Sequence, residues 1–288
     1  MSAAANLRPR DERLVDGEFV FTGENFRRIA TLMRSETGIH LPEAKATLVY
    51  SRLAKRLRQL GLPNFDAYCE LIASDRGEAE RNAMVAALTT NVTRFFREPH
   101  HFEHLRDRVL PALAEAARRG ARVRMWSSAC SSGEEPYSMA LTLLALMPEA
   151  ARFDVRILAT DIDPNVVATA KAGAYSDHAV EPIPAPLRER WMTRVDGKWR
   201  AGEEMRALVR FNTLNLIGAW PMKGRFDVIF CRNVVIYFEQ ETQDLIWQRF
   251  QSVLAPNGRL YVGHSERVDS PAYASDGLTI YRLRGGAA

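Results

Sequence analysis

The sequence has few cysteines and no long apolar run. Its three cysteines, Cys69, Cys130 and Cys231, lie far apart, so we expect no disulfide framework and a reducing compartment. No apolar stretch approaches the roughly 20 residues that a membrane-spanning helix needs. Residues 1–16 carry charges and a proline where a signal peptide needs an apolar core. We therefore expect a cytoplasmic protein with no direct membrane insertion, although recruitment to membrane-bound partners stays open.

The chain also lacks a strong charge of either sign. A net charge of +4 and a pI of about 9.1 permit an acidic partner without requiring one. With 288 residues, of which 47% are hydrophobic and 26% charged, the chain can bury one large core or two modest ones. The composition therefore indicates a folded globular protein and excludes a disordered one.

The first third of the chain contains only helix patterns. We expect residues 1–20 to be flexible and residues 21–88 to form a small helical domain, with helices over 25–36, 43–60, 65–74 and 78–88. Residues 89–99 are rich in poor helix formers and end in Pro99, which suits the first turn of a helix. This segment is therefore predicted to be a linker.

The rest of the chain, residues 100–288, alternates between helix and strand patterns. Helices are expected over 100–118, 134–147, 164–173 and 240–254, and strands over 122–128, 153–160, 211–215, 226–231, 259–263 and 277–283. Such alternation predicts an α/β fold with a doubly wound, mostly parallel sheet. The alternation is interrupted over about 176–210, where an Asp196-Gly197 turn predicts a small antiparallel β insert.

One apolar strand runs straight into polar residues. Residues 226–231 read as a strand covered on both faces, and Arg232, Asn233 and Tyr237 follow it. Open α/β sheets bind their ligands at the carboxyl ends of central strands. The three polar side chains are therefore candidates for a binding site.

A second candidate site follows the strand over 122–128. Small residues lead into a helix that begins with Glu134 and Glu135, and small residues let a ligand approach the main chain. A helix start normally favours a phosphate, but two glutamates would repel it. The site better suits a cationic ligand without phosphate, such as S-adenosylmethionine, although Glu135 alone is also explained by the helix dipole.

Two further strand ends carry polar residues. Asp161 follows the strand over 153–160 and can accept hydrogen bonds from both hydroxyls of a ribose. Asp163 precedes Pro164 and reads as a helix cap. Asn215 with Leu216, at the end of another strand, could bind an adenine.

Together these motifs resemble one family, the CheR chemotaxis receptor methyltransferases, which methylate glutamate side chains of bacterial chemoreceptors with S-adenosylmethionine. The resemblance extends from about residue 21 to the end of the chain. It rests on TNVTRFFR (90–97), SSGEEPY (131–137), ATDID (159–163), Asn215-Leu216, FCRN (230–233), IYF (236–238) and GHSE (263–266).

The resemblance implies a Rossmann-like methyltransferase domain and a set of pocket residues. The implied cofactor-binding residues are Asn91, Thr93, Arg97, Glu134, Asp161, Asn215, Leu216, Arg232 and Asn233. Arg97 and Tyr237 would lie closest to the transferred methyl group and are the expected catalytic residues. Arg97 could hold the substrate carboxylate or the cofactor's own carboxylate, and both remain open. No metal is implied.

The expected helix over 43–60 carries a basic face formed by Arg52, Lys55 and Arg56. The resemblance implies that this face recognises acidic receptor helices, although a charged helix face is commonly only solvated. Some family members bind a pentapeptide at the receptor's C-terminus through a longer glycine-bearing loop in the insert. Here the turn at 195–198 is tight, so we expect no such tether.

Other functions are weighed against this one. His100 and His104 have the spacing of a zinc pair but lack a third ligand, and neither Cys130 nor Cys231 has a partner that would activate a thiol. A methyltransferase that acts on nucleic acid would show steeply salt-dependent binding. A non-catalytic module that binds S-adenosylmethionine or docks to receptors is the remaining alternative.

Overall fold

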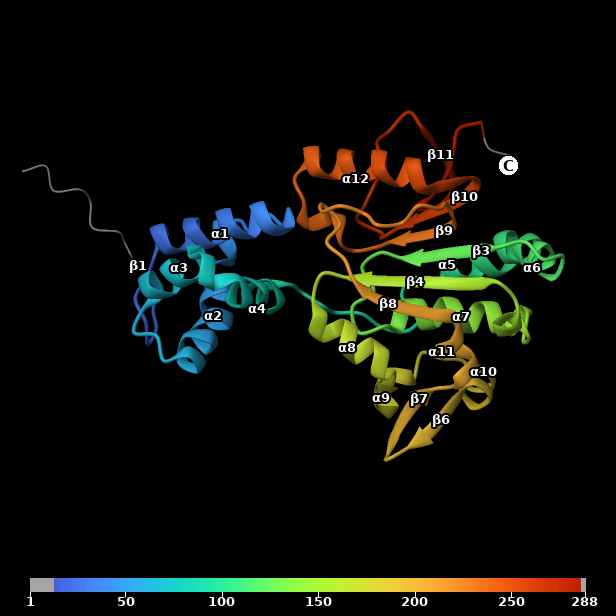
Figure 1. Cartoon of the computed structure of the whole chain (residues 1–288), viewed down its shortest axis with the longest axis horizontal. Coiled ribbons are helices and arrows are strands. Elements are labelled where there is room, and N and C mark those ends of the chain that lie inside the picture. Colours follow the sequence, from blue (N-terminus) through green and yellow to red (C-terminus); the bar gives the residue numbers. More distant parts are fainter. Residues whose placement is uncertain (1–12, 286–288) are drawn as a thin grey trace, which may run out of the picture. The chain divides into compact units, whose positions relative to one another are not determined.

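The computed structural model describes residues 13–285, and the chain divides into two units, Met1–Thr89 and Thr90–Ala288 (Figure 1). Residues 1–12 of the expected flexible N-terminus lie outside the described residues. Over residues 13–285, no helix is long and apolar enough to cross a membrane.

The first unit is helical, with a short hairpin at its start. Its helices are α1 (Gly23–Thr37), α2 (Ala46–Leu60), α3 (Phe65–Ala73) and α4 (Glu78–Leu88). The Thr22 hydroxyl accepts from the Asn25 main-chain N–H at 3.2 Å and caps α1. Gly38 and Gly61 end α1 and α2 in the left-handed conformation.

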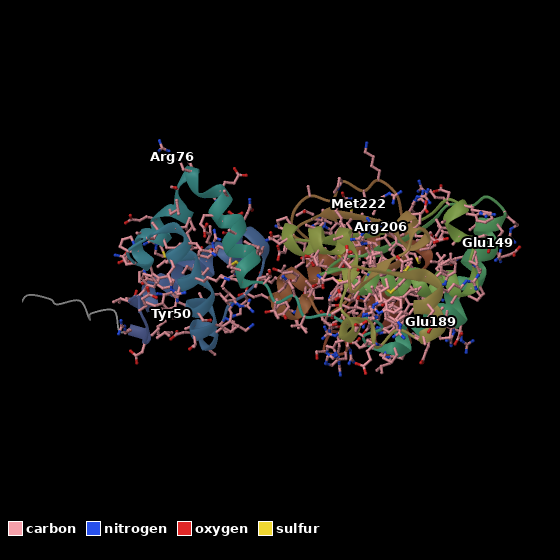
Figure 2. All side chains as sticks on the ribbon, turned by 90° about the horizontal axis from the view of Figure 1, so that it is seen from below. Tyr50, Arg76, Glu149, Glu189, Arg206 and Met222 are labelled. Carbon is pink, nitrogen blue, oxygen red and sulfur yellow. The ribbon has the colours of Figure 1, made fainter. Side chains whose placement is uncertain are left out.

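Part of the segment expected to be flexible, residues 1–20, contributes to a short hairpin. Strand β1 (Arg13–Val15) pairs antiparallel with β2 (Phe21–Thr22). The pairing is anchored because the Phe21 ring is buried 4.5 Å from the ring of Phe65 and 5.9 Å from that of Tyr50. In Figure 2 Tyr50 lies within this unit, whereas Arg76 points outward.

The second unit contains a seven-stranded sheet and confirms the predicted α/β fold. The strands, from edge to edge, are β11 (Tyr273–Gly277), β12 (Ile280–Leu283), β10 (Leu254–Val262), β9 (Phe226–Cys231), β3 (Val123–Ser127), β4 (Val155–Asp161) and β8 (Val209–Thr213). Neighbours from β10 to β8 are parallel, and β12 and β11 are antiparallel.

The sheet reverses its winding between β3 and β9. From β3 the chain proceeds through β4 to β8 at one edge, then returns to β9 and continues through β10 in the other direction. Ligands of doubly wound folds bind at the carboxyl ends of the strands at such a reversal. The topology therefore locates a binding site after β3 and β9.

Helices cover both faces of this sheet. They are α5 (Pro99–His104), α6 (Leu110–Arg118), α7 (Glu134–Leu146), α8 (Pro164–Ala172) and α12 (Gln240–Val253) (Figure 1). Met125 packs in the core that α5 to α8 form on one face. The next residue, Trp126, faces the other side, where its ring lies 5.3 Å from that of Phe250 in α12.

The expected helix over 100–118 contains one irregular turn. Leu105–Val109 is a π-helical turn in which the Leu110 N–H donates to the Leu105 carbonyl. Pro111 has no N–H to donate, so the regular α-helical ladder cannot continue through this point. The helix therefore forms in two pieces, α5 and α6.

The antiparallel hairpin predicted in the insert is confirmed, and a third strand just before the predicted bounds joins it. Its strands β5 (Ala174–Tyr175), β7 (Lys198–Ala201) and β6 (Met192–Val195) form an antiparallel sheet in that order, flanked by α9 (Asp177–Val180), α10 (Ala185–Trp191) and α11 (Glu203–Leu208). Asp196 and Gly197 form the two-residue turn, with φ of 50° and 75°.

The C-terminal segment differs from the single strand expected over 277–283. It forms two antiparallel strands, β11 and β12, joined by a turn in which Thr279 has a φ of 56°. Tyr273 and Ile280 are buried, but the residues between them are largely small or polar. The edge strand β11 therefore lacks the apolar run that predicts a buried strand.

Candidate active site

The candidate site lies at the carboxyl ends of β3, β4 and β9, under residues 90–98 of the linker. Several hydrogen bonds join this linker to the rest of the second unit. The Ser131 hydroxyl donates to the Asn91 carbonyl at 2.7 Å, and the Phe96 N–H donates to the Ser138 hydroxyl at 3.0 Å. Asn91 also donates through Nδ2 to Asp163 at 3.0 Å.

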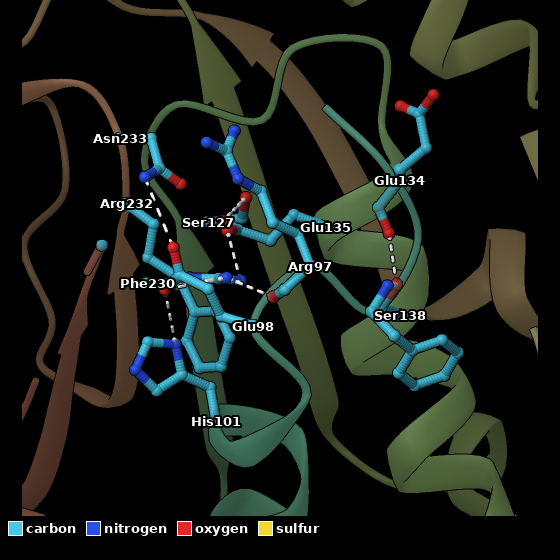
Figure 3. A network of polar contacts seen from close by, with 12 residues as sticks. Arg97, Glu98, His101, Ser127, Glu134, Glu135, Ser138, Phe230, Arg232 and Asn233 are labelled. Carbon is cyan, nitrogen blue, oxygen red and sulfur yellow. Dashed lines mark hydrogen bonds and ion pairs between the residues drawn. The ribbon is translucent and has the colours of Figure 1, made fainter. Parts of the chain in front are cut away.

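Glu134 is a buried carboxylate at the start of α7. Its Oε2 accepts from the Ser132 hydroxyl at 2.7 Å, and burial raises the pKa of this carboxyl. Within residues 13–285 no cation pairs with it, and Figure 3 shows its carboxylate pointing away from the neighbouring polar network. A buried carboxylate without a protein cation suits a cationic ligand.

Asp161 ends β4 and holds the loop that follows β3. Its Oδ2 accepts from the Ser131 N–H at 2.8 Å, and its Oδ1 accepts from the Asp163 N–H at 3.1 Å. Burial raises the pKa of the Asp161 carboxyl, although these hydrogen bonds oppose the rise. The helix-cap prediction for Asp163 is confirmed, because its Oδ1 accepts from the Asn165 N–H at 2.9 Å.

Asn215 and Leu216 lie in the loop after β8. The Asn215 Oδ1 accepts from the Ile217 N–H at 3.1 Å. The buried Leu216 is fixed through its carbonyl, which accepts from Trp220 Nε1 at 3.0 Å and from Arg249 Nη1 at 2.7 Å. The loop is therefore held against α12 with an apolar side chain beside an amide.

Arg232, which is expected to line the cofactor pocket, has a buried side chain. Its side chain is 1% exposed, and its Nη1 donates to Glu135 at 3.2 Å while its Nη2 lies 3.3 Å from Glu98. Nη2 also donates to the carbonyl of Arg97. Two buried carboxylates hold the guanidinium more strongly than a solvent-facing position could.

Glu135 is the counter-charge of this arginine. Its Oε1 accepts from the Ser127 hydroxyl at 2.7 Å, and its Oε2 accepts from Arg232. Burial raises the pKa of the Glu135 carboxyl, and the Arg232 charge lowers it in part. The helix dipole alone therefore does not account for Glu135.

Two site residues were missed as candidates, Glu98 and Glu266. Glu266 accepts from four main-chain N–H groups, those of Gly263 at 2.6 Å and of Asn233, Val234 and Val235 at 2.8 Å each. It fixes Asn233, which has a φ of 56°. A Cβ on Gly263 would lie 2.5 Å from Asn233 Nδ2, so a glycine is required there.

The two expected catalytic residues lie in different segments of this unit. The Arg97 guanidinium donates through Nη1 to the Val92 carbonyl at 3.1 Å, and Figure 3 shows it extending away from His101. Tyr237 ends a short 3₁₀ turn, Val235–Tyr237, and is half-buried. Thr93 is half-buried in the linker.

Two of the three residues of the basic face expected on α2 have partners within the helical unit. Arg52 donates through Nη1 to the carbonyls of Ala87 and Thr89 at 3.1 and 2.7 Å. Arg56 forms an ion pair with the buried Glu80, to which its Nε donates at 3.0 Å. Of the three expected substrate-recognition residues, Lys55 is the one whose side chain is exposed.

No metal site emerges in the described part of the chain, where no three His, Cys, Asp or Glu side chains are grouped to hold an ion. His104 Nδ1 lies 2.9 Å from the Tyr261 hydroxyl, and His101 Nε2 lies 2.9 Å from that of Thr279. These histidines join α5 to the sheet and its C-terminal hairpin.

The donor set fits S-adenosylmethionine. Glu134 offers a buried negative charge to an ammonium group, and Asp161 can reach a ribose. Gly133, with a φ of 98°, lets the turn before α7 pack closely on α8, since a Cβ there would lie 2.9 Å from Ala170 Cβ. No phosphate would be tolerated between the two carboxylates.

Comparison with known proteins agrees with this geometry. Residues 91–276 match the model of the CheR methyltransferase SAM-binding domain, and residues 24–89 match that of the CheR all-alpha domain. A probable chemotaxis protein methyltransferase of Rhizobium etli is 54% identical over 258 residues, covering 87% of this chain and 96% of the relative.

Two other relatives have the same coverage pattern. Chemotaxis protein methyltransferase 2 of Pseudomonas aeruginosa is 43% identical over 277 residues, which cover 92% of this chain and 94% of the relative. The chemotaxis protein methyltransferase of Escherichia coli is 40% identical over 267 residues, which cover 90% of each chain.

Proposed function

The chain belongs to the CheR methyltransferase family, whose members use S-adenosylmethionine in chemotaxis, and we propose that its methyl acceptor is a glutamate side chain of a chemoreceptor. The product would be a glutamate methyl ester on the receptor's cytoplasmic helices, together with S-adenosylhomocysteine. This ester would serve chemotactic adaptation.

The observation that carries the proposal is the charge of Arg97. Within residues 13–285 no carboxylate pairs with its guanidinium, which donates a hydrogen bond to the Val92 carbonyl at 3.1 Å. Arg232 nearby already has two carboxylate partners. An arginine without a carboxylate partner at the switch point suits a substrate that brings its own carboxylate.

The remaining residues divide between binding and orientation. Glu134 would bind the cofactor's ammonium group, Asp161 its ribose, and Asn215 with Leu216 its adenine. When bound, S-adenosylmethionine supplies a methyl group on a positively charged sulfur. A glutamate is already ionised at neutral pH, so the chain needs no general base and acts mainly by orientation.

Arg97 and Tyr237 would provide that orientation. Arg97 would hold one face of the incoming carboxylate, and the Tyr237 hydroxyl would donate to a substrate or cofactor oxygen. Arg97 binding the cofactor's own carboxylate is the competing role. The two roles differ in what the Arg97→Lys variant loses: affinity for S-adenosylhomocysteine or affinity for the receptor.

The acceptor is tested by transfer of labelled methyl from S-adenosylmethionine to purified receptor cytoplasmic domains. We expect label that base treatment releases and that maps to glutamate residues. For variants of Arg97, Arg94→Ala is the matched control, because Arg94 is an exposed arginine in the same linker. Base-stable label on another residue type would exclude glutamate as the acceptor.

We further propose that no C-terminal pentapeptide tether is used. The insert turn at Asp196 and Gly197 has only two residues between paired Val195 and Lys198, which leaves no longer loop to bind a peptide. Receptor domains with and without their last five residues should be methylated at equal rates. Micromolar binding of the isolated pentapeptide would overturn this proposal.

A nucleic-acid substrate is less well supported. It would require a continuous basic face to contact phosphates. On α2, however, Arg52 and Arg56 have internal partners, so the face is reduced to Lys55.

A further inference from the structure

The linker carboxylate Glu98 contacts three segments at the candidate site. Its Oε1 accepts from His264 at two positions, from the main-chain N–H at 3.3 Å and from Nδ1 at 2.9 Å. Asn233 Nδ2 lies 3.5 Å from the same oxygen. Its Oε2 lies 3.3 Å from Arg232 Nη2 and 3.5 Å from His101 Nδ1. Glu98 therefore joins the loops after β9 and β10 to the start of α5 (Figure 3).

The main chain at Glu98 adopts an uncommon conformation. Glu98 has a φ of 58°, and Phe96 and Asn233 have φ of 51° and 56°. A non-glycine residue in this region costs about 1 kcal/mol or more. The surrounding contacts must therefore offset this cost separately at Phe96, Glu98 and Asn233. Such clustering is typical of functional sites rather than of simple packing.

The conformation has a direct effect on Arg97. The Arg97 carbonyl accepts a hydrogen bond from Arg232 Nη2, the same nitrogen that pairs with Glu98. Arg232 is 1% exposed and Glu98 11%, so neither partner can turn to solvent without losing the other. The main chain of Arg97 is thus fixed by a charge pair that does not itself face the substrate.

The ionised state of Glu98 agrees with this geometry. Burial alone would raise the pKa of its carboxyl, but the Arg232 charge and the two hydrogen bonds from His264 lower that pKa to about 2. Glu98 is therefore negatively charged at neutral pH. The Glu98 Oε2, the Arg232 Nε and the His101 Nδ1 are buried without a well-formed hydrogen bond, so the Oε2 side of Glu98 is held mainly by the Arg232 charge and the Oε1 side by the hydrogen bonds from His264.

We propose, resting on the function above, that Glu98 is a positioning residue for methyl transfer. Through Arg232 it fixes the main chain of Arg97 and so aims the Arg97 guanidinium at the incoming carboxylate. Of the expected cofactor-binding residues, Arg232 and Asn233 lie within this chain of contacts. Glu134 and Asp161, to which we assign the ammonium group and the ribose, lie outside it. Glu98 should therefore affect turnover far more than cofactor affinity.

The test is a double-mutant cycle of Glu98→Gln with Arg97→Lys. Glu98→Gln keeps the size of the side chain and removes the charge, and we expect kcat to fall about tenfold. Affinity for S-adenosylhomocysteine, measured by calorimetry, should change less than about twofold. In the Arg97→Lys background, Glu98→Gln should lower kcat by less than about twofold. A lysine has no planar guanidinium whose orientation Glu98 could fix.

Three controls keep the result readable. Glu98→Asp retains the charge and should recover part of the lost kcat. Glu115→Gln, on an exposed glutamate of α6, should leave every parameter unchanged. Thermal unfolding of each variant shows whether a loss of kcat comes from a loss of the fold or from a displaced Arg97 side chain.

A purely structural role predicts a different pattern. The losses of Glu98→Gln and Arg97→Lys would then multiply, or cofactor affinity would fall in step with kcat. Either outcome overturns the proposal. Failure of the proposed function is seen separately, as base-stable label in the unmodified protein, and the cycle can still be read on whichever acceptor is methylated.

Discussion

Each unit of this protein buries a carboxylate, but the two carboxylates have different partners. In the helical unit Glu80, 8% exposed at its side chain, accepts from Arg56 and from the Tyr68 hydroxyl at 2.9 Å. In the methyltransferase unit Glu134 accepts from the Ser132 hydroxyl, and no cation of the described chain pairs with it. The first carboxylate is matched within its own unit, whereas the second still lacks a positive partner.

The arginines show the same contrast. Arg56 binds a carboxylate within its own unit, whereas Arg97 donates to a carbonyl oxygen. A buried charge that is already paired contributes to folding, and removing one partner is costly. A charge at the candidate site without such a partner is available to a ligand. The comparison therefore separates residues that hold the fold from residues that bind, although both kinds are charged.

The largest expected effect is on the matched pair of the helical unit. Glu80→Ala leaves Arg56 and the Tyr68 hydroxyl without their acceptor, and we expect a loss of about 3 kcal/mol in the free energy of unfolding of this unit. The value is at the low end for buried pairs because Arg56 is partly exposed. Urea unfolding followed by circular dichroism measures it.

The matched control is Glu70→Ala, on an exposed glutamate of α3, which should change the free energy of unfolding by less than about 0.5 kcal/mol. Equal stability of the Glu80 and Glu70 variants would show that the buried pair does not hold the fold.

The next effect is on the unmatched arginine. Arg97→Ala should lower kcat/KM for receptor methylation on the order of 100-fold, because the carboxylate loses its charged guide and its orientation. Stability should hardly change, since the Arg97 guanidinium donates to one main-chain carbonyl and has no carboxylate partner within residues 13–285. Initial rates of base-labile label give the measurement. A stability loss as large as that of Glu80→Ala would place Arg97 with the fold-holding residues.

Much of the fold could be predicted because the local patterns are strong. Strand β9 and the start of helix α4 lie at the residues predicted from the sequence. The Asp196-Gly197 turn correctly predicts the hairpin of the insert. Two elements could not be predicted in this way. The π-helical turn before Pro111 depends on one missing N–H, and β11 is an edge strand of small and polar residues.

The site was harder to predict than the fold, because pairing partners lie far apart in the chain. A helical wheel places Arg56 on a polar face but does not reveal Glu80, which is 24 residues away. Likewise Arg232 stands beside Asn233 at a strand end, yet its partner Glu98 is 134 residues before it. Glu98 and Glu266 are loop carboxylates with no charge pattern of their own. Glu266 ends the GHSE motif (263–266) that carries part of the family resemblance, but nothing in that motif indicates that its carboxylate accepts from the main chain of another loop.

A smaller effect is expected from the unmatched glutamate. Glu134→Gln should weaken binding of S-adenosylhomocysteine about tenfold at neutral pH, because a charge-assisted hydrogen bond to the ammonium group becomes a neutral one. Ser132→Ala is the control for the neighbouring hydroxyl and should cost less. Calorimetric titration at constant ionic strength measures both.

The same variant gives a pH test with a definite sign. Burial raises the pKa of Glu134 above 4.5, and only its ionised form attracts an ammonium group. Affinity of the unmodified protein should therefore fall as the pH drops toward that raised pKa. The affinity of the Glu134→Gln variant should fall less, so the two curves of affinity against pH converge at acid pH. Parallel curves would mean that Glu134 does not bind the ammonium group. Asp161, whose pKa is also raised, accounts for dependence that remains in the variant.

The smallest effect is expected at the surface of the helical unit. Lys55 is the exposed member of the expected basic face, and Lys55→Ala should raise the KM for receptor about threefold while kcat and stability stay unchanged. The difference should shrink as salt is added, because exposed charges are screened. Arg58→Ala tests the same helix at an arginine already bound to Glu18 at 2.9 Å, and it should have less effect. A larger rise in KM for Arg58→Ala than for Lys55→Ala would contradict this expectation. The presence of a partner would then not predict which cation contacts the receptor. The contrast between paired and unpaired charges would hold only for buried residues.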